Sequence, residues 1–164
     1  MTTPPPGIRV RHLGAEDWRV ARAARLGALA TSPPGSFSTT FEEAAGWDER
    51  RWRHWQASRS LFVLESDPGP VGCAGVLRES SGPVLVSVWV HPTVRGTGAS
   101  RLLIGTIVDH VRAAGDTTLR LWVVEGNTPA EKLYHAMGFE PTGRRQLTAA
   151  HSPHYEYEMI RHLA

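Results

Sequence analysis

The sequence predicts an α/β (α+β) fold with one shared core, and three stretches of the chain carry that prediction. Residues 84–115 join a β-branched run, a turn with two glycines and a run whose apolar side chains recur every three to four positions. This pattern is typical of strand, turn and helix. Residues 8–77 read as a strand, two helices and a two-stranded hairpin, and residues 118–161 as a strand, a helix and two last strands. The sequence therefore predicts a sheet of six to seven strands with about four helices.

The first helix is expected after a short strand at residues 8–13. Glu16 and Asp17 favour a helix N-terminus, and helical character continues to Leu29. We expect Arg22 and Arg25 on the solvated side of this amphipathic helix. A break rich in proline, glycine and hydroxyl residues follows at 31–40, which no helix crosses.

A second helix is expected over residues 41–58, where tryptophans stand among charged residues. Trp52 and Trp55 are three positions apart and share a helix face, so we expect core packing, with some of the aromatic surface lining a substrate pocket. Residues 61–64 and 71–77 form the hairpin, joined by a turn that contains proline and glycine.

The C-terminal part begins with a strand at residues 118–124. Thr128 and Glu131 form a capping box with proline between them, which predicts a helix start at that point. The helix should end at Met137-Gly138-Phe139, and strands are expected at residues 139–145 and 155–161.

Composition indicates one domain over residues 1–164, with a flexible leader at residues 1–7. The chain has 41% hydrophobic and 21% charged residues, and its formal charge of +2 does not indicate nucleic-acid binding. Cys73 is the single cysteine, which excludes an internal disulfide. No stretch approaches the roughly 18 apolar residues of a membrane span, so we expect a cytoplasmic protein without a membrane partner. Arginine far outnumbers lysine, which suggests a GC-rich, bacterial genome.

The turn at Arg95-Gly96-Thr97-Gly98-Ala99-Ser100 has the features of a phosphate-binding site. Glycines let the backbone bend tightly, and the following helix offers unpaired N–H groups and the positive end of its dipole. A dinucleotide fingerprint would need glycine at Arg101, and a P-loop would need a Gly-Lys pair, whereas the sole lysine is Lys132. Both alternatives are disfavoured, while an acyl-CoA cradle and a glycine turn that binds nothing stay open.

Two segments resemble the GNAT (GCN5-related) family of N-acetyltransferases. The glycine turn is similar to the family signature Gln/Arg-x-x-Gly-x-Gly/Ala, with serine at the third position. A second signature is matched by Leu121, Val123, Asn127, Ala130, Leu133, Tyr134, Gly138 and Phe139. The resemblance implies a mixed, mostly antiparallel sheet with a V-shaped split between the fourth and fifth strands.

The resemblance also implies that acetyl-CoA is the cosubstrate and indicates where it binds. Its pantetheine arm would pair with the fourth strand, including Trp89 and Val90, and Asn127 would hold the cofactor near the next helix. The backbone N–H groups expected to hold the diphosphate belong to Arg95, Gly96, Gly98, Ala99 and Ser100.

Tyr134 is the catalytic acid that this resemblance implies. A phenol with a reference pKa of about 10 stays protonated at neutral pH and can donate to the departing thiolate, whose thiol has a pKa of about 8.5. Relatives often carry a glutamate base on the fourth strand, but residues 83–86 hold no carboxylate. Glu43, Glu79, His154 and a water chain stay open as the base. The scattered histidines predict no metal site.

The acceptor is expected to be a primary amine on a small molecule or peptide. By resemblance, the loops at residues 31–41 and 146–155 shape its site, with Phe37, Phe41, Glu43 and Tyr155 as candidate contacts. An enzyme acting in a ternary complex is the leading hypothesis, and a non-catalytic acyl-CoA-binding sensor or partner module is the alternative. Homodimers are common in the family and are possible here.

Overall fold

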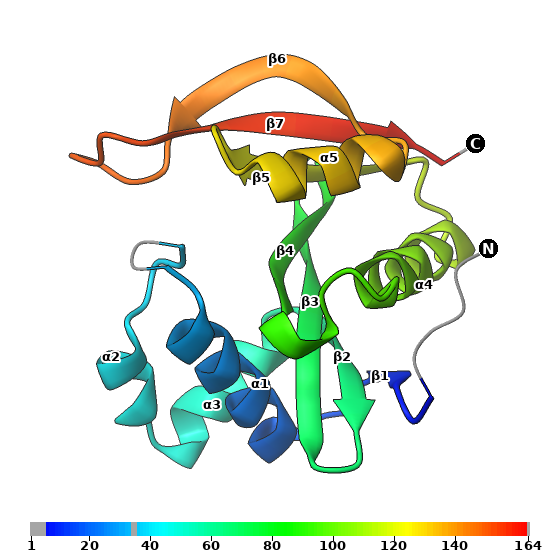
Figure 1. Cartoon of the computed structure of the whole chain (residues 1–164). Helices are drawn as coiled ribbons and strands as arrows, with labels where there is room; N and C mark the ends of the chain where they lie inside the picture. Colours follow the sequence, from blue (N-terminus) through cyan, green and yellow to red (C-terminus); the bar gives the residue numbers. More distant parts are fainter. Residues whose placement is uncertain (1–5, 34–35, 164) are drawn as a thin grey trace.

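The computed structural model describes residues 6–33 and 36–163, and this part forms one seven-stranded sheet with five α-helices (Figure 1). Residues 1–5 of the predicted leader lie outside the described part. The strands are β1 Arg9–His12, β2 Ser60–Ser66, β3 Gly69–Glu79, β4 Gly82–Val90, β5 Thr118–Val124, β6 Glu140–Leu147 and β7 Tyr155–His162. The helices are α1 Trp18–Thr31, α2 Phe41–Ala45, α3 Glu49–Ala57, α4 Ala99–Ala113 and α5 Thr128–Ala136.

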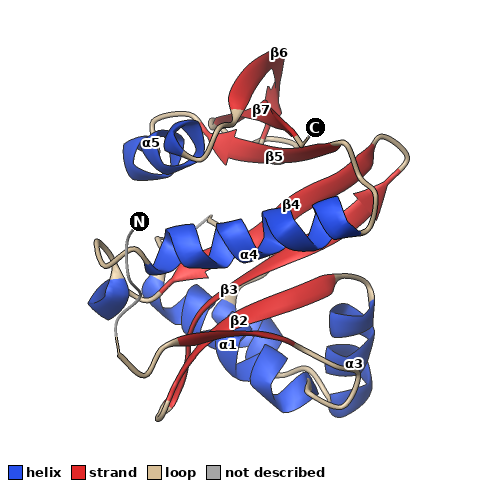
Figure 2. Cartoon of the chain, turned by 90° about the vertical axis from the view of Figure 1, so that its right-hand side faces the viewer, coloured by secondary structure: helices blue, strands red, loops and turns tan. Residues whose placement is uncertain are grey.

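The sheet has the strand order β1-β2-β3-β4-β5-β7-β6 and confirms the predicted mixed, mostly antiparallel architecture. Neighbouring strands are antiparallel except for β4 and β5. A parallel pair needs a crossover, which α4 provides. Figure 2 shows that β4 and β5 run apart from each other, with α4 on the viewer's side of β4 and α5 beside the end of β5.

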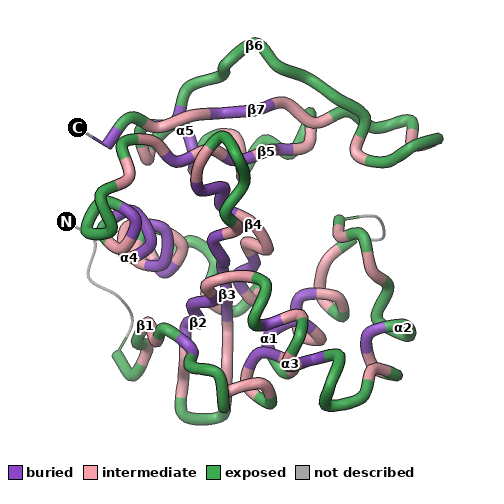
Figure 3. Tube along the Cα trace, turned by 180° about the vertical axis from the view of Figure 1, so that it is seen from behind, coloured by how far each residue is buried: buried purple, intermediate pink, exposed green. Residues whose placement is uncertain are grey.

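Helices cover both faces of the sheet, and alternation along the strands separates two clusters. On β2, Phe62 and Leu64 belong to the cluster that contains the apolar face of α4, while Leu61 and Val63 belong to the cluster beneath α1. Tyr134 of α5 is part of the first cluster. Figure 3 shows buried residues concentrated on the central strands and on the inner sides of α1 and α4, whereas β6 is exposed along its length. None of the helices in residues 6–33 and 36–163 combines the length and apolarity that a membrane crossing requires.

The single helix predicted over residues 41–58 was wrong, because this segment forms two helices. Gly46 ends α2, and the Asp48 side chain accepts a hydrogen bond from the Arg51 N–H and caps α3. The tryptophans still meet as expected, with Trp52 fully buried and its ring centroid 5.9 Å from that of Trp55.

The solvated position predicted for Arg25 was also wrong. Its side chain is 5% exposed, whereas Arg22 is half-buried. Arg25 shares the sheet-facing side of α1 with Ala21 and Ala28, whose methyl groups are buried and fill little space. These small neighbours leave room for a long side chain between helix and sheet.

Candidate functional site

The central feature of the site is the point at which β4 and β5 separate. The parallel ladder consists of Val84 with Arg120 and Leu85 with Leu121. Beyond these pairs β4 remains paired with β3, and β5 with β7. We call the diverging segments, residues 86–90 of β4 and 122–124 of β5, the split. In the split, the edge of β4 that faces β5 and the edge of β5 that faces β4 do not cover each other.

The backbone of Val90 is turned towards the split. The N–H of His91 donates to the Val71 carbonyl on β3 at 2.8 Å. Because the backbone N–H and C=O groups of successive strand residues point to opposite edges, those of Val90 point away from β3 and towards the split. Consistently, the Val90 carbonyl accepts from Nε of Arg95 at 3.2 Å rather than from β3. Val90 therefore presents main-chain groups where an extended ligand could add to the edge.

A β-bulge interrupts β4 within the split, and no sequence pattern predicted it. The β3–β4 register shifts between Cys73 and Gly75, and Ser87 has a φ of +58°, which is uncommon for a residue with a side chain. The Ser87 carbonyl accepts from the Cys73 thiol at 3.3 Å. Bulges re-aim side chains and are frequent beside active sites, so Ser87 marks where the edge of β4 changes direction.

The predicted glycine turn follows β4 and opens α4. Gly96 and Gly98 have φ of +75° and +87°, and Gly98 is the N-cap residue without a side-chain hydrogen bond. In the described part of the chain, the N–H groups of residues 96–101 appear in no hydrogen bond. Unpaired N–H groups at a helix N-terminus suit diphosphate oxygens, so the residues present fit the diphosphate of acetyl-CoA.

Two predicted cofactor contacts, Arg95 and Trp89, have defined positions beside this turn. The Arg95 N–H is directed to the Pro92 carbonyl at 3.4 Å, and its side chain holds the Val90 carbonyl. The Trp89 indole is buried on the opposite face, where its N–H donates to Oγ1 of Thr31 at 2.8 Å. Trp89 can therefore contribute to a site in the split through its backbone, not through its ring.

Asn127 caps the second helix that begins at the split. Its Oδ1 accepts from the Ala130 N–H at 3.4 Å, and the Glu131 carboxylate accepts from the Gly126 N–H at 2.9 Å. The predicted capping box was thus misplaced by one residue, because Asn127 rather than Thr128 is the N-cap. The amide NH₂ of Asn127 remains exposed at the turn and can donate to a ligand.

Tyr134 lies on α5 with its side chain 7% exposed, in the same buried cluster as Val90 of β4 and Ala99 of α4. Its ring meets that of Phe139 edge to face at 6.0 Å between centroids. Burial raises the pKa of Tyr134 to about 12, because an apolar environment disfavours the phenolate. The hydroxyl is therefore a neutral proton donor at any physiological pH.

The pH dependence of turnover follows from this pKa. The folded pKa of Tyr134 is about 12 and lies above the reference value of 10.0, so the protonated phenol stabilises the fold below about pH 10 and this contribution is lost between about pH 10 and 12. If Tyr134 is the acid, kcat should show no decline between about pH 7 and 10. Steady-state rates across this range check the expectation, and a decline with an apparent pKa below about 9 would contradict it.

The three candidate bases lie in different places. Glu79 pairs with Gly82 at the end of β4 opposite to Val90, so its carboxylate is removed from the split. Glu43 is exposed on α2, and His154 is exposed in the β6–β7 connection. Figure 1 shows this connection and the segment between α1 and α2 on the same side of the molecule, which leaves Glu43 and His154 as the candidates nearer to the expected acceptor loops.

The predicted acceptor contacts fall into two groups. Phe41 and Tyr155 are exposed, and Tyr155 stacks with the Arg145 guanidinium at 3.5 Å from its ring centroid. Phe37, in contrast, is half-buried against the cluster beneath α1, where the Arg25 guanidinium lies 4.5 Å from its ring centroid. Arg25 and the nearby Arg59 were not predicted as site residues from the sequence, because arginine side chains usually face solvent.

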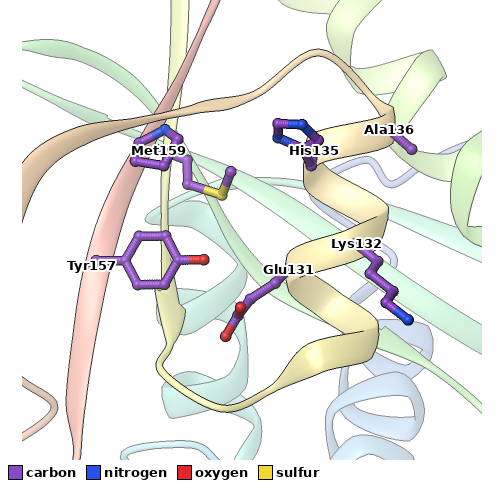
Figure 4. A pocket seen from close by; sticks show the side chains of 7 residues that line it. Glu131, Lys132, His135, Ala136, Tyr157 and Met159 are labelled. Atoms are coloured by element: carbon purple, nitrogen blue, oxygen red, sulfur yellow. The ribbon is translucent and has the colours of Figure 1, made fainter.

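A separate pocket of about 390 Å³ lies between α5 and the last two strands (Figure 4). Figure 4 shows the Tyr157 hydroxyl and the Glu131 carboxylate pointing into the same space. Tyr134 does not line it, so this pocket lies on another side of α5 from the split. Its lining residues are Glu131, Lys132, His135, Ala136, Pro141, Tyr157 and Met159. Within the described ranges, no group of three or more His, Cys, Asp or Glu side chains is arranged to hold a metal ion.

Known proteins share this sequence pattern and fold. Residues 26–139 match the model of the acetyltransferase (GNAT) family. The mycothiol acetyltransferase of Thermobispora bispora is 28% identical over 156 residues, which cover 85% of this chain and 50% of the relative. That of Thermomonospora curvata is 34% identical over 92 residues, which cover 55% of this chain and 31% of the relative. The chain thus spans about a third to a half of the length of these curated relatives.

A solved structure extends the likeness to the whole sheet. The structure of yncA from Salmonella typhimurium was determined with its cofactor acetyl-CoA, and it matches this chain with a TM-score of 0.75 at 18% sequence identity. The match covers 96% of this chain and 95% of the yncA chain. This likeness concerns the fold. The family match spans both the glycine turn and Tyr134, and this chain belongs to the GNAT family of acetyltransferases.

Proposed function

We propose that this chain transfers the acetyl group of acetyl-CoA to a primary amine in a ternary complex. The observation that carries the proposal is the meeting of three features at the end of β4: an uncovered strand edge, a row of unpaired N–H groups and a buried neutral phenol in the adjoining cluster. Together these features can hold an extended thioester and protonate its sulfur.

Each part of the chain has a task in this proposal. The N–H groups of Gly96, Gly98, Ala99 and Ser100 hold the diphosphate, and Asn127 donates from the start of α5. The edge of β4 at Val90 aligns the pantetheine arm. A main-chain N–H turned towards the split can stabilise the developing oxyanion.

Acetyl-CoA, when bound, supplies the thioester whose carbonyl carbon the acceptor amine attacks, so that a C–N bond forms and the C–S bond breaks. Tyr134 gives its proton to the departing sulfur. The amine nitrogen releases one proton, which replaces the proton that Tyr134 has given. Because a pKa of about 12 makes a free phenolate costly, we expect proton donation to accompany cleavage of the C–S bond rather than to precede it.

Two measurements test the proposal. Isothermal titration with acetyl-CoA and CoA should give saturable binding, and a panel of primary amines should include acceptors that release CoA thiol above the background rate. Binding without turnover across the panel would favour the alternative, a domain that holds acyl-CoA as a sensor or partner module, for which the missing carboxylate at residues 83–86 is the specific observation. Absence of CoA binding would contradict both.

A further inference from the structure

Two arginines meet at one tryptophan on the α1 face of the sheet. Arg25 of α1 lies between two rings, with its guanidinium carbon 4.5 Å from the centroid of Phe37 and 5.4 Å from that of Trp55. Arg59, just after α3, lies 4.4 Å from the Trp55 ring. We call Arg25, Phe37, Trp55 and Arg59 the arginine cage.

Among the residues that the structure describes, no carboxylate pairs with either of these two charges. The ion pairs of residues 6–33 and 36–163 involve neither Arg25 nor Arg59. Nε of Arg25 is buried without a hydrogen-bond partner. Cys73 lies close enough to interact with both charges, but burial raises the pKa of its thiol to about 12, so the sulfur is neutral and cannot serve as the counter-ion. The cage therefore holds two buried or half-buried cations and no anion.

This arrangement is costly for the folded protein. Burial lowers the pKa of Arg25, and burial together with the nearby charge of Arg25 lowers that of Arg59. The faces of Phe37 and Trp55 offset part of the desolvation, but unpaired cations away from water usually attract an anion. A hydrophobic pair would fill the same space at lower cost, so the charges point to a ligand.

The cage also touches the place where chemistry is expected. Nη1 of Arg59 donates to Oγ of Ser87 at 3.0 Å, and Ser87 is the bulged residue of β4 within the split. Phe37 comes from the segment between α1 and α2, on the side of the molecule that the β6–β7 connection also faces (Figure 1). The cage thus adjoins the thioester-binding edge of β4 from the face opposite to α4 and α5.

From these contacts we infer that the acceptor is an amine that carries a carboxylate, and that Arg25 and Arg59 bind this carboxylate while the amine reaches the thioester. The inference rests on the proposed function and specifies its substrate class. Glu43, the only carboxylate among the acceptor contacts expected from the sequence, is exposed on α2 and takes no part in the arginine cage. Two guanidinium groups suit a carboxylate because each presents paired N–H donors.

The test uses the full chain saturated with CoA and three matched probes: β-alanine, β-alaninamide and 2-aminoethylphosphonate. A second pair, L-phenylalanine and L-phenylalaninamide, tests a carboxylate on the α-carbon of an amine that has a larger side chain. Titration calorimetry should give a Kd at least about tenfold lower for a carboxylate than for its amide, and acetylation rates should follow the same order. Tighter binding of the phosphonate than of β-alanine would overturn the assignment to a carboxylate.

The variants Arg25→Met and Arg59→Met keep the side-chain stem and remove the charge. Each should weaken carboxylate binding by at least about tenfold and leave amide binding within about twofold. Arg51→Met is the matched control, because Arg51 also lies over a tryptophan, 4.4 Å from the centroid of Trp47, but is exposed on α3. Its carboxylate affinity should be unchanged.

Thermal unfolding separates recognition from a structural role. If the cage exists for a ligand, Arg25→Met should keep or raise Tm, because a buried unpaired charge is removed. A loss of Tm together with equal losses for carboxylate and amide would overturn the inference, as would equal wild-type affinities or no measurable carboxylate binding. These results are distinct from failure of the proposed function, in which CoA itself does not bind.

Discussion

Replacing Tyr134 with phenylalanine should lower kcat by about a hundredfold while leaving CoA affinity unchanged. The change removes one hydroxyl and retains the ring that packs against Phe139, so the fold should persist. General acid catalysis is typically worth about 10²- to 10⁴-fold, and the hydroxyl has no part in holding the diphosphate. Steady-state release of CoA thiol, together with calorimetric titration of CoA, measures both quantities.

The matched control for this variant is Tyr157→Phe. Tyr157 lies on β7, burial raises its pKa as well, and its hydroxyl faces Glu131 in the separate pocket (Figure 4). Its turnover should stay within about twofold of the wild type, because its hydroxyl is outside the split. Equal losses in both variants would mean that a general effect on the fold, and not proton donation, lowers the rate.

Replacing Gly98 with valine should weaken CoA binding by about tenfold to a hundredfold. Gly98 has a φ of +87° at the N-cap of α4, and a β-branched residue in this region costs about 1–3 kcal/mol. The backbone can relieve this strain by rotating out of the left-handed region, which would turn the N–H groups of the cradle away from the diphosphate. Calorimetric titration with CoA gives the affinity directly.

Gly115→Val provides the comparison at the other end of α4. Gly115 has a φ of +93° and no atom within 4 Å of an added Cβ, so its substitution should strain the backbone similarly and lower Tm by a similar amount. CoA affinity should fall only for Gly98→Val. If both variants bind CoA as tightly as the wild type, the glycine turn is not the phosphate cradle.

Most of the fold could be predicted from the sequence, because the patterns that indicate its strands, helices and turns involve residues close together in the chain. Alternating apolar residues set the strands, and the turn at Gly96 and Gly98 needs positive φ angles that favour glycine. The order of elements and the mixed sheet were confirmed. The break at Gly46 was missed because aromatic and charged residues typical of an amphipathic helix continue on both sides of it, with Phe41 before it and Trp47 after it.

Less of the candidate site could be predicted from the sequence, because part of the site depends on tertiary packing. The bulge at Ser87 arises from a register shift against β3, and no local sequence pattern predicts it. Arg25 has the spacing of a solvated helix residue, yet the alanines around it place it against the sheet. Contacts between segments distant in sequence, such as Arg59 with Ser87, decide the chemistry of this face.

The most direct measurement of the central claim is a crystal structure of this chain with CoA. We expect diphosphate oxygens within about 3.5 Å of the N–H nitrogens of Gly98, Ala99 and Ser100, and the CoA sulfur within about 3.5 Å of the Tyr134 hydroxyl. A diphosphate bound elsewhere, or a sulfur out of reach of that hydroxyl, would contradict the account.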